Sequence, residues 1–119
     1  MTSLDKWRTE CQKRVARGVA FLDEREPGWR ERVNIETLDV SSGLRCPLAQ
    51  GCGTTFMGGM MRHGLTNKDA EALGFYINGF DSFFSSLRPL PFYGAIAVLD
   101  EVWRTEVGRT VEEPELVSA

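Results

Sequence analysis

The chain has 119 residues, of which 42% are hydrophobic and 26% are charged, and its formal net charge is -3. This size and composition predict one globular domain and exclude the class of disordered chains, which combine few apolar residues with a high net charge. The net charge gives no overall attraction to phosphate backbones and no apolar run reaches the roughly 18 residues of a membrane-spanning helix, so we expect neither a nucleic acid nor a membrane as partner.

The first predicted element is a helix over residues 3–26. Apolar residues recur about every fourth position and form one stripe along it: Leu4, Trp7, Cys11, Val15, Val19 and Leu22. Thr2 and Asp5 have the spacing of a capping pair, and Pro27 followed by Gly28 ends the helix. Three basic residues fall away from the stripe and are expected to face solvent: Lys13, Arg14 and Arg17.

The next segment, residues 29–45, contains both an alternating and a helical apolar pattern. We favour short helical turns, with Asn34 as a helix N-cap, and leave a two-stranded ribbon open. Pro47 suits the first position of a following helix, where its missing N–H costs nothing. Residues 51–64 carry five glycines, which weaken a helix, although four apolar residues keep a helical spacing there: Phe56, Met57, Met60 and Met61.

Clearer helix signals return in the second half of the chain. Thr66 and Asp69 predict a capped short helix that ends at Gly74, and a further short helix is expected within residues 81–87. The last helix is predicted to start at Phe92, to carry an apolar stripe, to close at Gly108 and to pack against the first. The prediction is therefore an all-α, single-domain helical bundle over residues 1–109, with long first and last helices and short irregular helices between them, followed by a flexible acidic tail over 110–119.

Three cysteines without a preceding apolar leader predict reduced thiols in a cytoplasmic protein. Cys46, Cys52 and His63 have the chemical types that bind zinc, but their spacings of six and eleven residues exceed the two to four typical of paired zinc ligands. Alternatively, Cys46 at a helix start could be a nucleophile with His63 as its base. A thiol- or zinc-dependent protein stays an alternative, but no metal ligand, cofactor or catalytic residue is assigned.

A second alternative is a DNA-binding regulator with a helix-turn-helix over residues 66–87. Ala70 lies four residues before Gly74, the spacing that lets the two helices of that motif cross closely. Asp69, however, occupies a position that is normally apolar. The expected recognition segment, residues 76–85, has no Lys or Arg for phosphates and base edges. These two features count against the DNA-binding alternative, which stays open.

One stretch of the chain combines a Leu-Asp-Glu helix end, a Pro-Gly-Trp turn and a Cys-x-Leu-x-Gln finish, and the residues concerned are Leu22, Asp23, Glu24, Pro27, Gly28, Trp29, Leu38, Asp39, Ser41, Cys46, Leu48 and Gln50. This combination resembles a family of small uncharacterised proteins encoded by actinobacteria and their phages. Residues 73–75 and 97–107, with Trp103, are also similar. The chain departs from the family at Pro47 and Ala49, where the family tends to have an apolar residue and a glycine. The resemblance implies an origin and no particular activity.

The predicted function is a non-enzymatic protein-binding module, a phage-derived modulator of a host or phage protein, with a homodimer as an alternative assembly. The chain has more aromatic and methionine residues than a small core needs, and exposed apolar patches mark interfaces. The residues predicted to bind the partner are Met57, Met60, Met61, Tyr76, Phe80, Phe83, Phe84 and Tyr93.

Overall fold

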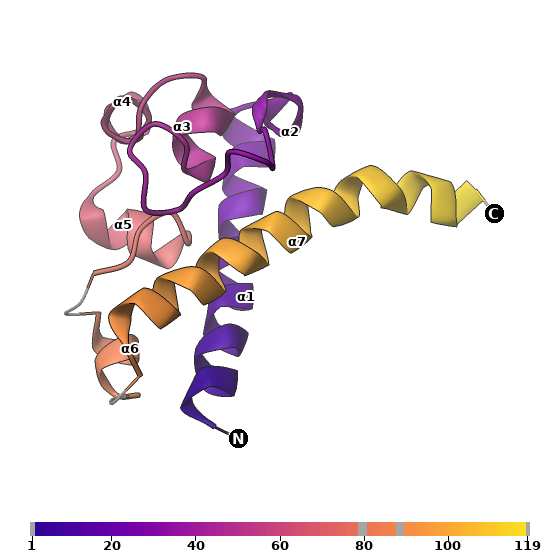
Figure 1. The fold of residues 1–119 in the computed structure, drawn as a ribbon. Helices are drawn as coiled ribbons and strands as arrows, with labels where there is room; N and C mark the ends of the chain where they lie inside the picture. Colours follow the sequence, from indigo (N-terminus) through magenta and orange to yellow (C-terminus); the bar gives the residue numbers. More distant parts are fainter. Residues whose placement is uncertain (1, 79–80, 88–89, 119) are drawn as a thin grey trace.

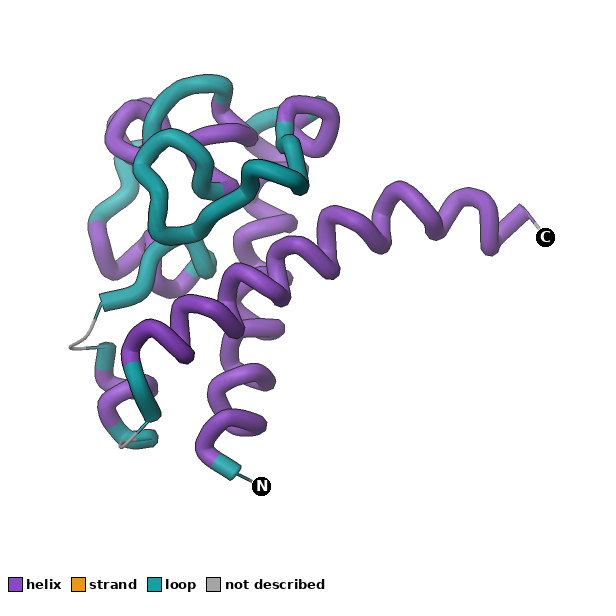
Figure 2. Tube along the Cα trace, in the orientation of Figure 1, coloured by secondary structure: helices purple, strands orange, loops and turns teal. Residues whose placement is uncertain are grey.

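The computed structural model describes residues 2–78, 81–87 and 90–118, with side chains described as far as Gly108. This part of the chain contains helices and no strand, which confirms the all-α prediction (Figures 1 and 2) and removes the ribbon over 29–45. The helices are α1 (Ser3–Arg25), α2 (Trp29–Arg32), α3 (Pro47–Cys52), α4 (Phe56–His63), α5 (Asn67–Ala72), α6 (Ser82–Ser85) and α7 (Phe92–Ser118).

The two long helices, α1 and α7, cross each other, as predicted (Figure 1). At the crossing, the indole N–H of Trp7 donates a hydrogen bond of 2.9 Å to the carbonyl of Ala95. Helix α7 continues past the expected end at Gly108, and its last turns extend away from the rest of the chain (Figure 1). The division into a domain over 1–109 and a flexible tail over 110–119 stays a prediction.

The predicted helix caps are confirmed at several ends. Thr2 and Thr66 each form a capping box with the aspartate three residues later, which satisfies two backbone N–H groups that the helix leaves free. Cys46 is the N-cap of α3, its Sγ accepting from the N–H of Ala49 at 3.4 Å, and Pro47 takes the first helical position. Local sequence therefore places the starts of α1, α3 and α5.

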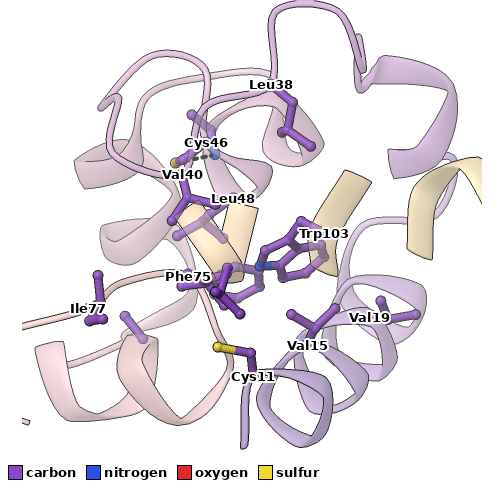
Figure 3. Close-up of a cluster of buried hydrophobic side chains, with 14 of the residues drawn as sticks. Cys11, Val15, Val19, Leu38, Val40, Cys46, Leu48, Phe75, Ile77 and Trp103 are labelled. Atoms are coloured by element: carbon purple, nitrogen blue, oxygen red, sulfur yellow. Dashed lines mark hydrogen bonds between the residues drawn. The ribbon is translucent and has the colours of Figure 1, made fainter. Parts of the chain in front are cut away.

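Trp103 lies at the centre of the buried core (Figure 3). Its ring stacks on Phe75 with 5.6 Å between centroids, and its N–H donates a 2.7 Å hydrogen bond to the carbonyl of Gly74. Gly18 of α1 permits this arrangement, because a Cβ at that position would lie 2.1 Å from the carbonyl oxygen of Leu73 and 2.9 Å from the Trp103 ring. The segment after α5, residues 73–75, therefore packs between α1 and α7.

Arg14 does not face solvent, contrary to the sequence-based expectation. Its guanidinium makes two hydrogen bonds, of 2.7 and 3.0 Å, to the carboxylate of Asp81, and both residues are buried. A third contact of 2.8 Å joins Arg14 to Glu10 one turn earlier. The helical stripe could not reveal this pair, because its acidic partner lies 67 residues away. The ion pair fixes the start of α6 against α1.

Residues 33–46 form a loop of turns rather than a regular helix (Figure 2). Asn34 is not a helix N-cap, because its side chain accepts from the N–H of Glu36 in a local turn. Polar residues of α7 hold the loop: Asp100 accepts from the N–H of Val40 at 2.9 Å, and Arg104 donates to the carbonyls of Ile35 and Leu38. The loop is therefore positioned by α7.

Candidate functional site

An apolar groove of about 390 Å³ lies where four segments meet. The loop before α3, the start of α4, the segment after α5 and the first turns of α7 all contribute to its wall. The lining residues are Val40, Ser41, Ser42, Gly43, Phe56, Phe75, Tyr76, Ile77, Phe92 and Ile96. The size falls within the roughly 300–1,000 Å³ of ligand pockets, and among the described lining residues the polar side chains are the hydroxyls of Ser41, Ser42 and Tyr76. The groove suits apolar groups.

Hydrogen bonds hold the groove walls in place. The N–H of Phe56 donates to the carbonyl of Gly43 at 2.7 Å, which ties the loop to α4. Asp39 accepts from both the N–H and the hydroxyl of Ser41, at 3.0 and 2.6 Å, and these bonds hold the pKa of the Asp39 carboxyl below its usual value. Phe56 and Tyr76 pack together with centroids 5.9 Å apart. The wall is therefore built before any ligand binds.

Exposed apolar side chains flank the groove. Leu44, Met57 and Tyr93 are each the direct chain neighbour of a lining residue, and they are 67%, 62% and 85% exposed. Met61, 78% exposed, follows Met57 by one turn of α4. Adjacent Cα atoms are 3.8 Å apart, so the backbone of Leu44, Met57 and Tyr93 lies beside the groove, and the Tyr93 ring meets the lining ring of Phe92 with centroids 6.2 Å apart. An apolar hollow with an apolar rim is typical of an interface.

The structure separates the eight predicted partner-binding residues into groups. Met57, Met61 and Tyr93 are exposed and Tyr76 lines the groove, whereas Met60 and Phe84 are buried core residues and cannot contact a partner. Helical spacing alone could not distinguish the two faces of so short a helix as α4. Phe83 is 37% exposed, and its ring centroid lies 6.3 Å from that of Trp7. It is not among the lining residues of the groove. Phe80 lies outside the described residues.

Several groove residues were not predicted, among them Leu44, Val40, Ile77 and Ile96. Val40 lies in a segment whose apolar residues fit two periods, so neither period identifies its exposed face, and Ile77 lies in an irregular segment. The sequence assigns Ile96 to the apolar stripe of α7. Leu44 stands alone between Gly43 and Arg45 in a turn. An isolated apolar residue in a turn is the one signal that could have identified the rim.

A polar cluster forms a second candidate site, at the ends of three helices. Glu26 follows α1, Cys52 ends α3 and His63 ends α4, and their ligand-type atoms all lie within 4.8 Å of one another. His63 Nε2 lies 2.7 Å from Glu26 Oε2, and Arg62 Nη1 lies 3.0 Å from the same oxygen. The sequence-based grouping of Cys46 with Cys52 and His63 is thus wrong for Cys46, whose sulfur caps α3, while Glu26 was missed.

The electrostatics of the cluster are set by the carboxylate. Partial burial favours a neutral Glu26, but hydrogen bonds from Arg62, His63 and Cys52 outweigh it and hold the pKa of this carboxyl below its usual value. Burial, and next the Glu26 charge, raise the pKa of the Cys52 thiol to about 12. Burial also raises the pKa of the Cys46 thiol, the opposite of what an activated nucleophile at a helix start requires.

The helix-turn-helix expected over residues 66–87 is not formed by the described part of that range. Helix α5 ends at Ala72, residues 73–78 are not helical, and α6 covers only Ser82–Ser85. A recognition helix would need to follow the first helix after a turn of three or four residues. The close approach that Ala70 and Gly74 allow instead serves packing against α1, where the backbone of Arg14 and Val15 lies near Gly74.

Comparison with protein-family models, with curated proteins and with solved structures found no match to the chain. Among the described residues, no helix combines the length and the apolar character needed to cross a bilayer. The proposals below therefore rest on the residues of the groove and of the polar cluster.

Proposed function

We propose that the protein is a non-enzymatic, cytoplasmic binding module that holds an apolar segment of another protein in the groove between the 40–43 loop, Tyr76 and α7. The observation that carries this proposal is the coincidence of an apolar hollow with Leu44, Met57 and Tyr93, which leave most of their surface in water. Burial of apolar area contributes about 25 cal/mol per Å², so a partner that covers both wall and rim gains affinity.

The chemistry of the wall supports binding rather than catalysis. Among the described lining residues there is neither a histidine nor a cysteine, and the hydroxyl of Ser41 donates to the Asp39 carboxylate, a weak base because its pKa is held below the usual value. Nucleophilic catalysis needs a nucleophile within hydrogen-bond reach of a base that a third group orients. The polar groups therefore serve to shape the loop.

The kind of partner follows from the shape and chemistry of the groove. Aromatic and aliphatic side chains of a helix or an extended segment fit an apolar hollow with an apolar rim, and large apolar anchors supply most of the binding energy of protein interfaces. The resemblance of the sequence to proteins of actinobacteria and their phages makes a host or phage protein the expected partner. A second copy of the chain is the other occupant that a test must distinguish.

Selection of binders from a library of random peptides tests the proposal. We expect the enriched peptides to carry apolar anchors and to lose at least about tenfold in affinity for the variant Gly43→Trp. A Cβ at Gly43 meets no atom within 4 Å, so this position of the groove wall has room for the start of a larger side chain, and we expect the indole to reduce the space open to a peptide.

The matched control is Gly108→Trp, which also places its Cβ in open space but lies twelve residues beyond Ile96 on α7, about 18 Å along the helix. This variant should bind the peptides as the parent does. Peptides that bind the parent and Gly43→Trp equally well would remove the groove as the binding site. Light scattering on both variants tests whether the occupant is a second copy of the chain. If the chain self-associates through the groove, Gly43→Trp should have a lower measured mass than the parent, and Gly108→Trp should not.

A further inference from the structure

The cluster of Glu26, Cys52 and His63 has the composition of a metal site. The three residues supply a carboxylate, a thiol and an imidazole from the ends of α1, α3 and α4, and all three side chains are nearly buried. Zinc is bound by these three groups at about 2.0–2.3 Å, which places the ligand atoms of a tetrahedral site roughly 3.3–3.8 Å apart. The atoms of the cluster, within 4.8 Å of one another, reach that arrangement with small side-chain movements.

The charges favour a soft divalent cation. Coordination by the Cys52 thiolate and the Glu26 carboxylate supplies two negative charges, which balance the charge of one Zn²⁺. A thiolate and an imidazole together favour zinc over magnesium and calcium, which prefer oxygen ligands. Cysteine binds a metal as the thiolate, so binding of zinc releases the proton of the Cys52 thiol to solvent.

Contacts around the cluster position two of the ligands. The His63 ring packs edge-on against Phe21, with centroids 5.2 Å apart, and the Cys52 carbonyl accepts from Arg62 Nη1 at 2.9 Å. The Nε of Arg32 donates to the carbonyl of Gly51 at 2.8 Å. These contacts hold the His63 ring and the backbone around Cys52 in place.

Two arginines oppose cation binding. Arg62 lies 3.0 Å from Glu26 Oε2, and Arg32 Nη2 lies 3.6 Å from Oε1. A metal has to displace the hydrogen bond between His63 and Glu26 and to compete with Arg62. The Arg62 side chain is about half exposed, so it can turn into water when the carboxylate binds a metal.

We propose that Glu26, Cys52 and His63 bind one Zn²⁺ through three protein ligands, with a fourth position left for water, and that the ion joins the ends of α1, α3 and α4. This site is independent of the apolar groove. It uses two of the three residues of the zinc alternative drawn from the sequence and replaces Cys46 with Glu26.

Titration of chelator-treated protein with Co²⁺, a spectroscopic substitute for zinc, tests the site. We expect a thiolate-to-cobalt charge-transfer band that saturates at one equivalent and disappears on addition of Zn²⁺, together with a rise in the unfolding temperature. The band should be lost in Cys52→Ser and kept in Cys46→Ser, which retains an N-cap oxygen for α3. His63→Gln provides a second loss variant if Cys52→Ser folds poorly.

Arg62→Gln gives a result that a merely structural cluster would not produce. Removal of the competing cation should tighten Co²⁺ binding by about two- to fivefold, the equivalent of one exposed ion pair. A charge-transfer band that survives in Cys52→Ser, or the absence of any band in the folded parent protein, would overturn the proposed site.

Discussion

The two long helices and the segment between them share one apolar core but differ in how their backbones are held. Trp7 and Trp103 are fully buried where α1 and α7 cross, so this pair is stabilised chiefly by apolar burial. The helices from α2 to α6 have only four to eight residues, too few to be stable alone. Side chains of the long helices bind the backbone of the segment between them. Arg17 donates to the carbonyl of Ala72, and Arg104 donates to those of Ile35 and Leu38. The long helices are the scaffold, and both candidate sites lie mainly in the segment that polar contacts shape.

The largest effect should come from the centre of the scaffold. Trp103→Ala removes the stacked ring and the hydrogen bond to Gly74, and we expect a loss of about 3–5 kcal/mol in the free energy of unfolding, measured by urea denaturation. Trp103→Phe, the control, keeps a ring and should lose less. A loss below about 1 kcal/mol for the alanine variant would show that the core is not centred on this residue.

The buried ion pair between Arg14 and Asp81 links the scaffold to the middle segment. Asp81→Asn leaves the guanidinium with Glu10 as its remaining acid, and we expect a loss of about 3 kcal/mol. The double variant Arg14→Met with Asp81→Leu should lose less than either single change, because neither partner is then left unpaired. Additive losses would contradict a direct interaction.

The same pair predicts a dependence on pH. Burial favours a neutral Asp81, but hydrogen bonds from Arg14 and from the N–H of Phe84 outweigh it and hold the pKa of the carboxyl below its usual 3.8. The unfolded chain therefore binds the proton at higher pH than the folded one. The stability difference between the parent protein and Asp81→Asn should be constant above about pH 5 and shrink as the pH falls below 4. A stability difference that stays constant until the protein unfolds in acid would show that Asp81 does not titrate with a lowered pKa.

Gly18 marks where the middle segment approaches the scaffold. The methyl group of Gly18→Ala pushes both the Leu73 carbonyl and the Trp103 ring away from α1, and we expect the free energy of unfolding to fall by about 3 kcal/mol. Gly108→Ala is the matched control on α7: its Cβ meets open space, so the change should be neutral or stabilise by up to about 1 kcal/mol. Equal effects of the two changes in thermal unfolding would contradict the close approach at Gly18.

The smallest effect on stability should come from the rim of the groove. Leu44→Ser and Tyr93→Ser each change an exposed side chain, and we expect unfolding free energies within about 0.5 kcal/mol of the parent protein. Affinity for groove-binding peptides should fall in both variants. Unchanged peptide affinity would exclude these residues from the interface, and a marked loss of stability would show that they belong to the core.

The sequence predicts the scaffold well and the sites poorly, for a physical reason. Helical stripes and capping pairs are local, so residues such as Trp7, Thr2 and Thr66 could be assigned from spacing alone. The groove and the polar cluster are made by residues that come together only in the folded chain. Glu26 lies 37 residues from His63, and Arg14 lies 67 residues from Asp81. No periodicity reports such pairs, which explains why Arg14 was expected in solvent and Cys46 in the cluster.

The most direct test of the binding proposal is a methyl NMR titration with a peptide enriched by selection. Val40, Ile77 and Ile96 come from three separate segments of the groove wall, whereas Val15 and Val19 lie on α1 and outside the groove lining. We expect the methyl signals of the first three to shift together and to saturate at one equivalent of peptide, with those of α1 unchanged. Shifts confined to a single segment, or larger on α1 than on the wall, would contradict the groove as the binding site.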